Sequence, residues 1–141
     1  IAQCLVGSEM CIRDSYYTTT KGVLEKVKAH VDDVDFAVQP EVLSLLSSGN
    51  FGRYADEKGE MKVCFISNND ITGGNSGSAM FNSKGELLGL AFDGNWEAMG
   101  SDILYEPKMQ RTIGVDVRYI LFMIEKYGKA GNLIRELNIL N

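Results

Sequence analysis

The sequence predicts a mainly β chain that ends in helices. Met61–Ser67 reads MKVCFIS, a short apolar run with the length and composition of a strand. Ala79–Asn82 and Glu86–Phe92 flank Ser83-Lys84-Gly85, the pattern of a β-hairpin whose glycine takes a positive φ. Residues 87–92 are apolar throughout, which predicts a strand that is buried on both faces.

Two further elements are expected before these strands. Tyr16–Thr20 is rich in threonine and tyrosine, which favours a strand. Pro40–Leu46 is a predicted helix, because proline suits the first helical position and Gly49 supplies a stop. Residues 22–35 are ambiguous, since a helical stripe of apolar residues is broken at Asp32-Asp33.

The C-terminal part of the sequence predicts one strand and two helices. Thr112–Val115 has the composition of a short strand. Asp116 is a suitable N-cap for a helix that runs through Tyr127 and stops at Gly128. Leu133–Leu140 is predicted to form the second short helix.

Composition excludes two classes of partner. The 141 residues are 45% apolar and 23% charged, as in an ordinary globular domain. The net charge of −5 argues against nucleic acid, because phosphate binding needs a basic surface. The longest apolar stretch, Tyr119–Ile124, is far shorter than the roughly 18 residues needed to span a membrane.

Residues 1–15 differ from the rest of the sequence. They contain Cys4 and Cys11 and show neither strand nor helix periodicity. They resemble translated adapter read-through at the ends of environmental reading frames, although a disordered native end is the plainer alternative. We therefore expect the native domain in 16–141 and leave 1–15 out of the fold prediction. Cys64, inside an apolar strand, is then expected to be an inert thiol whose redox state the sequence does not specify.

The most specific chemistry lies in the glycine-rich loop 68–78. Ser76 stands between glycines and between two apolar strands, as acyl transfer requires. Glycines let backbone N–H groups turn toward one point, where they can stabilise an oxyanion. In the chymotrypsin-like pattern G-[DN]-S-G-[GS], which this loop resembles, the donors correspond to the N–H groups of Gly74 and Ser76. The sequence therefore predicts Ser76 as a nucleophile beside an oxyanion hole.

Three other interpretations of this loop are weaker or less specific. The α/β-hydrolase pattern G-x-S-x-G fails at Ser78, and a β pattern follows the loop instead of a helix. A phosphate-binding loop would need a lysine and a helix after its glycines. A glycine-rich connection without chemistry is the plainest alternative.

A longer resemblance favours the nucleophile. Residues 51–139 resemble the C-terminal end of the bacterial dipeptidyl-peptidase 7 and 11 family, chymotrypsin-fold serine exopeptidases that remove dipeptides from free N-termini. The runs that carry the resemblance are Phe51–Asp56, Val63–Phe65, Asn69–Ser78, Gly89–Glu97, Gln110–Ile113 and Val115–Tyr119.

The resemblance implies a fold and a setting. It implies that 16–141 are the C-terminal part of the peptidase domain, a portion of a chymotrypsin-like double β-barrel. It implies peptide substrates with a free N-terminus, a periplasmic or cell-surface location and homodimers in the full-length family. No cofactor and no metal are implied.

The resemblance also assigns roles to residues beyond Ser76. Asp93 matches the acid that holds the substrate's α-amino group, and Gly94 matches the position that shapes the S1 pocket. Arginine at that position accompanies acidic P1 residues, so glycine implies a hydrophobic P1 preference. Asp70 is given a structural role, because the family lacks trypsin-like specificity. Trp96-Glu97 could shape the edge of the site, or be a buried tryptophan and a solvated glutamate. One departure is Ala79-Met80, where the family has proline and an aliphatic residue.

The general base is missing from the predicted site. His30 is the single histidine and lies among helical lysines, which favours a surface position. The resemblance places the catalytic histidine and aspartate upstream, outside this chain. We therefore expect the 141-residue chain alone to be inactive, although the resemblance implies that its parent is a peptidase. The alternative is a pseudo-peptidase whose loop only binds peptides.

Overall fold

The computed structural model describes residues 17–100, 103–106 and 108–140, so the predictions for residues 1–15 lie outside the described residues. The chain divides into two compact units. The first contains 17–18 and 63–117 of the described residues, and the second contains 19–62 and 118–140. Each unit is described by itself.

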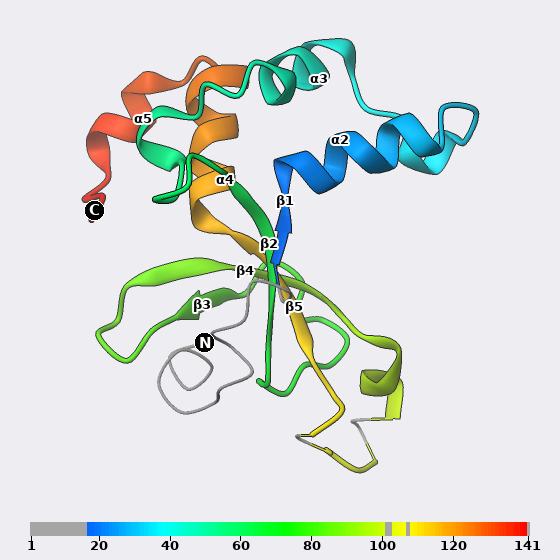
Figure 1. The fold of residues 1–141 in the computed structure, drawn as a ribbon. Coiled ribbons are helices and arrows are strands. Elements are labelled where there is room, and N and C mark those ends of the chain that lie inside the picture. The colour runs from blue at the N-terminus through cyan, green and yellow to red at the C-terminus, as the bar shows by residue number, and fades with distance from the viewer. Residues whose placement is uncertain (1–16, 101–102, 107, 141) are drawn as a thin grey trace. The chain divides into compact units, whose positions relative to one another are not determined.

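The first unit is built on a five-stranded sheet in the order β1-β2-β5-β4-β3 (Figure 1). Strand β2 pairs antiparallel with β5, β5 with β4, and β4 with β3. The sheet has open edges at β1 and β3, as a portion of a barrel would, so the predicted fold class is confirmed. The strands are β1 (Tyr17–Thr19), β2 (Lys62–Ser67), β3 (Ala79–Phe81), β4 (Leu87–Gly94) and β5 (Thr112–Asp116).

The core of this unit lies on one face of the sheet. Phe65, Met80 and Ala91 are buried together, and Tyr17, Ile71 and Leu88 pack against them. Gly89 lies under the Phe65 ring, where a Cβ would come within 2.8 Å of Cε1. The glycine lets the two strands and the ring approach closely.

The prediction that residues 87–92 are buried on both faces is wrong for this chain. Leu87 is 41% exposed and Phe92 is 45% exposed, whereas Gly89 and Ala91 between them are buried. Successive side chains of a strand point to opposite faces, and the core covers only one of them. The pairing of β3 with β4 shifts between Met80 and Phe81, so Leu87 pairs with the exposed Phe81 and leaves the face of Gly89 and Ala91. An unbroken apolar run shows that both faces can be buried, but does not show that both are.

The hairpin and the loop before it form as predicted. Gly85 turns the β3–β4 connection with φ +77°, and Gly85 N–H donates to Asn82 O at 3.0 Å. Asn68–Ser78 connects β2 to β3 without regular secondary structure. Cys64 is free and half-buried, and burial raises the pKa of its thiol, which suits the predicted inert role.

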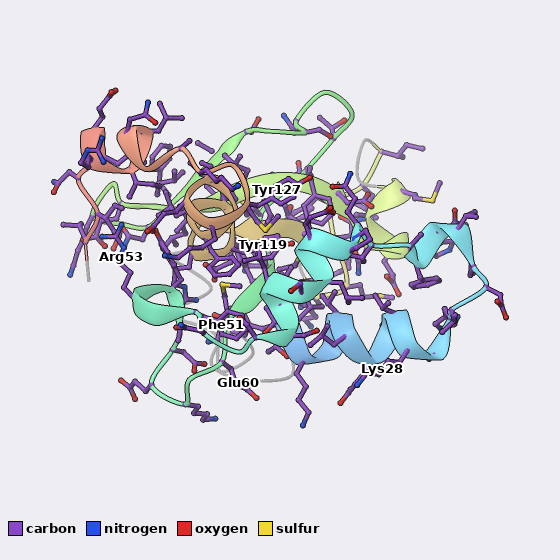
Figure 2. The ribbon with its side chains drawn as sticks, turned by 90° about the horizontal axis from the view of Figure 1, so that it is seen from above. Lys28, Phe51, Arg53, Glu60, Tyr119 and Tyr127 are labelled. Carbon is purple, nitrogen blue, oxygen red and sulfur yellow. The ribbon has the colours of Figure 1, made fainter. Side chains whose placement is uncertain are left out.

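The second unit consists of helices and turns. It contains α2 (Thr20–Ala29), η3 (Val34–Phe36), α3 (Pro40–Ser47), η4 (Gly52–Tyr54), α4 (Val117–Phe122), the π-helical turn η6 (Met123–Tyr127) and α5 (Gly131–Glu136). Phe51 is buried in this unit and Arg53 extends from it with half of its side chain exposed (Figure 2).

Three helix boundaries refine or correct the sequence prediction. The ambiguous segment 22–35 is helical up to Ala29. The helix predicted to end at Tyr127 changes to π geometry at Met123, and Gly128 N–H closes it by donating to Met123 O at 2.8 Å. The last helix covers Gly131–Glu136 and not 133–140, because the backbone is already extended at Leu137, with ψ 140°.

The described helices contain no segment of sufficient length and apolar character to cross a membrane.

Candidate active site

Two glycines shape the loop around Ser76. Gly74 has φ +96° and Gly77 has φ +87°, a region of backbone conformation that side chains with a Cβ rarely adopt. Space is open at both positions, so conformation and not crowding requires the glycines. The serine therefore sits on a turn that only this residue pattern forms without strain.

Asn75 closes this turn through both its side chain and its backbone. Its Oδ1 accepts from Thr72 N–H at 2.9 Å, and its own N–H donates to Thr72 O at 3.2 Å. Its carbonyl accepts from Ser78 N–H at 2.9 Å. Among the residues that the structure describes, none accepts a hydrogen bond from the N–H groups of Gly74 and Ser76, the two predicted oxyanion donors.

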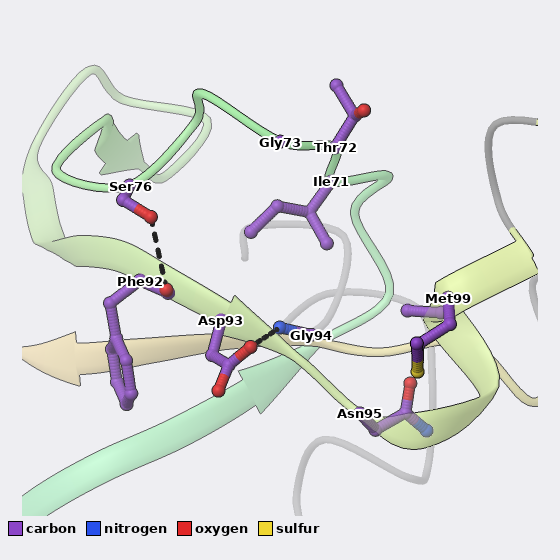
Figure 3. A pocket seen from close by; sticks show the side chains of 10 residues that line it. Ile71, Thr72, Gly73, Ser76, Phe92, Asp93, Gly94, Asn95 and Met99 are labelled. Atoms are coloured by element: carbon purple, nitrogen blue, oxygen red, sulfur yellow. Dashed lines mark hydrogen bonds between the residues drawn. The ribbon is translucent and has the colours of Figure 1, made fainter.

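The loop is tied to β4 at an irregularity in that strand. Gly77 N–H donates to Ala91 O at 2.7 Å, and Ala91 N–H donates to Ser78 O at 2.9 Å. In the pairing of β4 with β5, Ala91 and Asp93 face consecutive residues, so Phe92 is the extra residue of a β-bulge. The Ser76 hydroxyl donates to the Phe92 carbonyl at 3.3 Å (Figure 3).

Asp93 and Gly94 follow this bulge directly. Asp93 Oδ1 accepts from Gly94 N–H at 2.8 Å, which orients the exposed carboxylate (Figure 3). A Cβ at Gly94 would lie 3.0 Å from the Ala98 Cβ and 3.4 Å from Ile71 Cγ2. Position 94 thus lies against the apolar wall formed by Ile71 and Ala98, and glycine leaves that wall uncovered.

One pocket of about 310 Å³ brings most of the predicted site together. Ser76, Asp93 and Gly94 all line it, whereas Gly74 and Asp70 are not among its lining residues. Asp70 is exposed in the same loop, so it does not form the floor of this pocket. The remaining lining residues are Ile71, Thr72, Gly73, Phe92, Asn95, Ala98 and Met99.

Sequence reasoning missed the role of Asn95. Its side chain bonds to three residues, Glu97, Met109 and Arg111. An asparagine directly after a strand is a signal for side-chain-to-backbone bonding, and it could have marked this residue. Trp96 is 82% exposed, so the alternative prediction that it is buried is wrong.

The single histidine belongs to the second unit. His30 is exposed, and its ring stacks on Phe36 with centroids 4.3 Å apart. The predicted surface position is confirmed. Within the described residues, no group of histidine, cysteine and acidic side chains could hold a metal ion.

Comparisons with known proteins identify the family of this chain. The family model described as Peptidase S46 matches residues 8–139. The chain is 59% identical over 125 residues to dipeptidyl-peptidase 7 of Porphyromonas endodontalis, an alignment that covers 89% of this chain and 15% of the relative. It is 46% identical over 131 residues to the Asp/Glu-specific dipeptidyl-peptidase of Porphyromonas gingivalis, covering 90% of this chain and 18% of that relative.

A solved structure shows the same fold. The crystal structure of Porphyromonas endodontalis DPP11 in complex with the dipeptide Arg-Glu matches with a TM-score of 0.80 and 42% sequence identity. The match covers 88% of this chain and 18% of that protein, so the chain spans less than a fifth of the length of its relatives. The resemblance to the dipeptidyl-peptidases 7 and 11 is confirmed, and the chain belongs to the peptidase S46 family.

Proposed function

We propose that this chain carries the nucleophile of a serine-type dipeptidyl-peptidase, which releases dipeptides from the free N-terminus of peptides. The observation that supports it most directly is the meeting of Ser76, Asp93 and Gly94 in one pocket. A nucleophile and a carboxylate in one pocket can bind a substrate by its ammonium and cut it at a fixed distance. Family membership supports the same activity for the parent protein.

The proposed reaction begins with Ser76. Its Oγ bonds to the carbonyl carbon of the substrate's second residue while its proton passes to a base. The amine of the third residue then leaves with that proton, and water hydrolyses the acyl-enzyme. The N–H groups of Gly74 and Ser76 stabilise the oxyanion, each contributing roughly 3 kcal/mol in comparable enzymes. His30 stacks on Phe36, and we assign the base to the part of the parent outside this chain.

Asp93 limits the product to a dipeptide in this proposal. Its carboxylate accepts hydrogen bonds from the substrate ammonium, and charge-assisted bonds of this kind are about twice as strong as neutral ones. Among the described residues, only Gly94 N–H donates to this carboxylate, through Oδ1. Oδ2 accepts no hydrogen bond from the described residues, so it can still accept one from a substrate.

We further propose that the P1 residue is hydrophobic. Ile71, Ala98 and Met99 line the pocket, and none of the described residues that line it is lysine, arginine or histidine. Arg111 donates instead to the carbonyls of Gln110 at 2.7 Å and Lys108 at 3.0 Å.

Two dipeptidyl reporters that differ only in Leu or Glu at P1 test this preference in the full-length parent. We expect a higher kcat/KM for Leu, by about tenfold or more. A higher kcat/KM for Glu would overturn the proposed preference while leaving the peptidase activity standing. The relative at 46% identity that is named Asp/Glu-specific makes this comparison informative, although the relative at 59% identity carries no such specificity in its name.

Labelling with a fluorophosphonate tests the nucleophile. In the full-length parent we expect covalent labelling that Ser76→Ala abolishes. Ser78→Ala is the matched control, because Ser78 lies in the same loop but does not line the pocket. A parent that binds peptides but is never labelled would instead be the pseudo-peptidase. The 141-residue chain alone is expected to show no peptidase activity.

Two expectations about the parent rest on the family resemblance alone. We propose a periplasmic or cell-surface location and a homodimer. Fractionation of cells that express the parent gene tests the location, and sedimentation of the purified parent tests the oligomeric state.

A further inference from the structure

Each polar atom of the Asn95 side chain makes a hydrogen bond at the edge of the pocket. Its Nδ2 donates to Glu97 Oε2 at 2.7 Å and to Met109 O at 2.8 Å. Its Oδ1 accepts from Arg111 N–H at 2.8 Å. An amide has two N–H donors and one carbonyl, so each polar atom of this side chain has a partner.

The backbone of Asn95 continues the same connection. Its N–H donates to Arg111 O at 2.9 Å, and its carbonyl accepts from Ala98 N–H at 2.9 Å. Asn95 therefore joins the end of β4, the turn η5 (Trp96–Gly100) and the segment before β5. Five hydrogen bonds at one residue restrict these three segments to one arrangement.

The segment opposite Asn95 is held from its own side as well. The Arg111 side chain is buried and donates to the carbonyls of Gln110 and Lys108. Gln110 Nε2 donates to Leu104 O at 3.0 Å, and its Oε1 accepts from Glu106 N–H at 2.9 Å. Asn95, at the end of β4, therefore bonds to a segment that its own hydrogen bonds already hold in place. This makes Asn95 a fixed anchor for its neighbours.

The position of η5 decides the shape of the pocket beside Gly94. Ala98 lines the pocket, and its Cβ lies 3.0 Å from the point where a Cβ of residue 94 would stand. Ala98 is placed by its own N–H, which bonds to the Asn95 carbonyl. A shift of η5 would therefore deepen or close the apolar wall without moving Ser76, which is held by the separate bonds of its loop to β4.

We propose that Asn95 is a positioning residue that sets P1 specificity by anchoring η5, and with it Ala98, against Gly94. This inference rests on the proposed peptidase function and adds to it the device that fixes the size of the P1 side chain. Asn95 acts through its neighbours and needs no contact with the reacting atoms. Its removal should therefore change substrate selection more than the reactivity of Ser76.

The test uses Asn95→Ala in the full-length parent with two dipeptidyl reporters that differ only in Leu or Ala at P1. We expect the wild-type preference for Leu to fall by about tenfold, mainly through a higher KM for the Leu reporter. The rate of labelling by a small fluorophosphonate should stay within about twofold of wild type.

Asn82→Ala is the matched control. Asn82 uses the same kinds of bonds in the β3–β4 turn, where its Oδ1 accepts from Lys84 N–H and Glu86 N–H at 2.9 and 3.0 Å. It does not line the pocket, so the preference for Leu over Ala should be unchanged in this variant. Equal changes in both variants would mean general destabilisation and would overturn the proposed role.

Asn95→Asp keeps the proposal testable if the alanine variant does not fold. It retains the acceptor for Arg111 N–H but places a carboxylate oxygen against Glu97 and the Met109 carbonyl. We expect a partial loss of the Leu preference, by about threefold, with labelling retained. An unchanged preference in a folded variant would overturn the inference. A wild-type parent that is not labelled at all would instead overturn the proposed function.

Discussion

The core of the helical unit and the pocket of the sheet unit are held in different ways. In the helical unit, Phe122 is 1% exposed and meets the rings of Phe51 and Tyr54 edge-on, with centroids 5.7 and 6.0 Å apart. In the sheet unit, Ser76 and Asp93 are exposed and are held by hydrogen bonds to backbone groups of β4. The aromatic cluster is held by buried apolar area, whereas Ser76 and Asp93 are held by hydrogen bonds, which depend on direction.

This difference suits a binding site. Apolar packing is not directional and tolerates small movements of the packed groups. A hydrogen bond weakens steeply when its angle departs from linearity, so a few such bonds fix the orientation of a turn. Asn75 and Asn95 each bond across a turn next to the pocket, and the geometry there should depend on these two side chains more than on the core.

The largest expected effect is on the stability of the helical unit. Phe122→Ala should lower the free energy of unfolding of the chain by about 3–5 kcal/mol, because it removes the ring that Phe51 and Tyr54 pack against. Phe81→Ala is the matched control, since Phe81 is 53% exposed in β3 and should cost less than about 1 kcal/mol. Urea unfolding followed by far-UV circular dichroism measures both. Similar losses in the two variants would contradict the comparison.

The second effect concerns the carboxylate of the pocket. Asp93→Asn in the full-length parent should lower kcat/KM by about 100-fold, because a neutral amide cannot pair with the substrate ammonium. Substrates with an acetylated N-terminus should lose far less, so the ratio of rates on free and acetylated substrates is the readout. Asp70→Asn is the control, an exposed aspartate of the same loop that does not line the pocket. Equal losses on both substrates would argue against ammonium binding.

The sequence predicts the parts of this molecule that local patterns determine. The hairpin at Gly85, the loop 68–78 and the helix that begins at Pro40 follow from turn residues and periodicity. The meeting of Ser76 with Asp93 and Gly94 was predicted from a family resemblance, and the pairing of the loop with β4 brings it about.

Other features were not predictable because they depend on long-range pairing. The bulge at Phe92 arises from the register of β4 against β5, which no run of residues in β4 specifies. The hydrogen bonds of Asn95 form only because residues 109–111, fourteen or more positions later in the chain, lie next to it in the fold. The exposure of Leu87 and Phe92 depends on which face of the sheet the core covers.

A smaller effect is expected at the turn that presents the oxyanion donors. Asn75→Ala removes the acceptor of Thr72 N–H and should lower kcat of the parent by about tenfold with little change in KM. Asn75→Asp keeps an acceptor at the same place and should retain most of the activity. Affinity for a peptide boronate, which mimics the tetrahedral intermediate, should fall in parallel with kcat. A change in KM alone would indicate a role in substrate binding.

The smallest effect is electrostatic and lies in the helical unit. Glu125 accepts a hydrogen bond from the Tyr54 hydroxyl and one from Lys126 Nζ at 3.1 Å, and Arg53 Nη2 lies 3.6 Å away. The hydrogen bond from Tyr54, followed by the bond and charge of Lys126, holds the pKa of this carboxyl below its usual range. A carboxyl with a lowered pKa in the folded state stabilises the fold above its unfolded pKa, and this contribution is lost as pH falls through the folded pKa.

The free energy of unfolding of the chain should therefore decrease on acidification below roughly pH 4.3, where glutamate titrates in unfolded chains. Glu125→Gln should flatten this dependence by less than about one bound proton, since glutamine can still accept from Tyr54 but does not titrate. Glu57→Gln, at an exposed glutamate of the same unit, is the matched control for replacing a glutamate with glutamine. Urea unfolding at a series of pH values between 3 and 7, spaced by about one pH unit, measures how the free energy of unfolding depends on pH. Identical slopes in all three proteins would show that this network contributes packing alone, and that the helical unit depends on its aromatic cluster without electrostatic help.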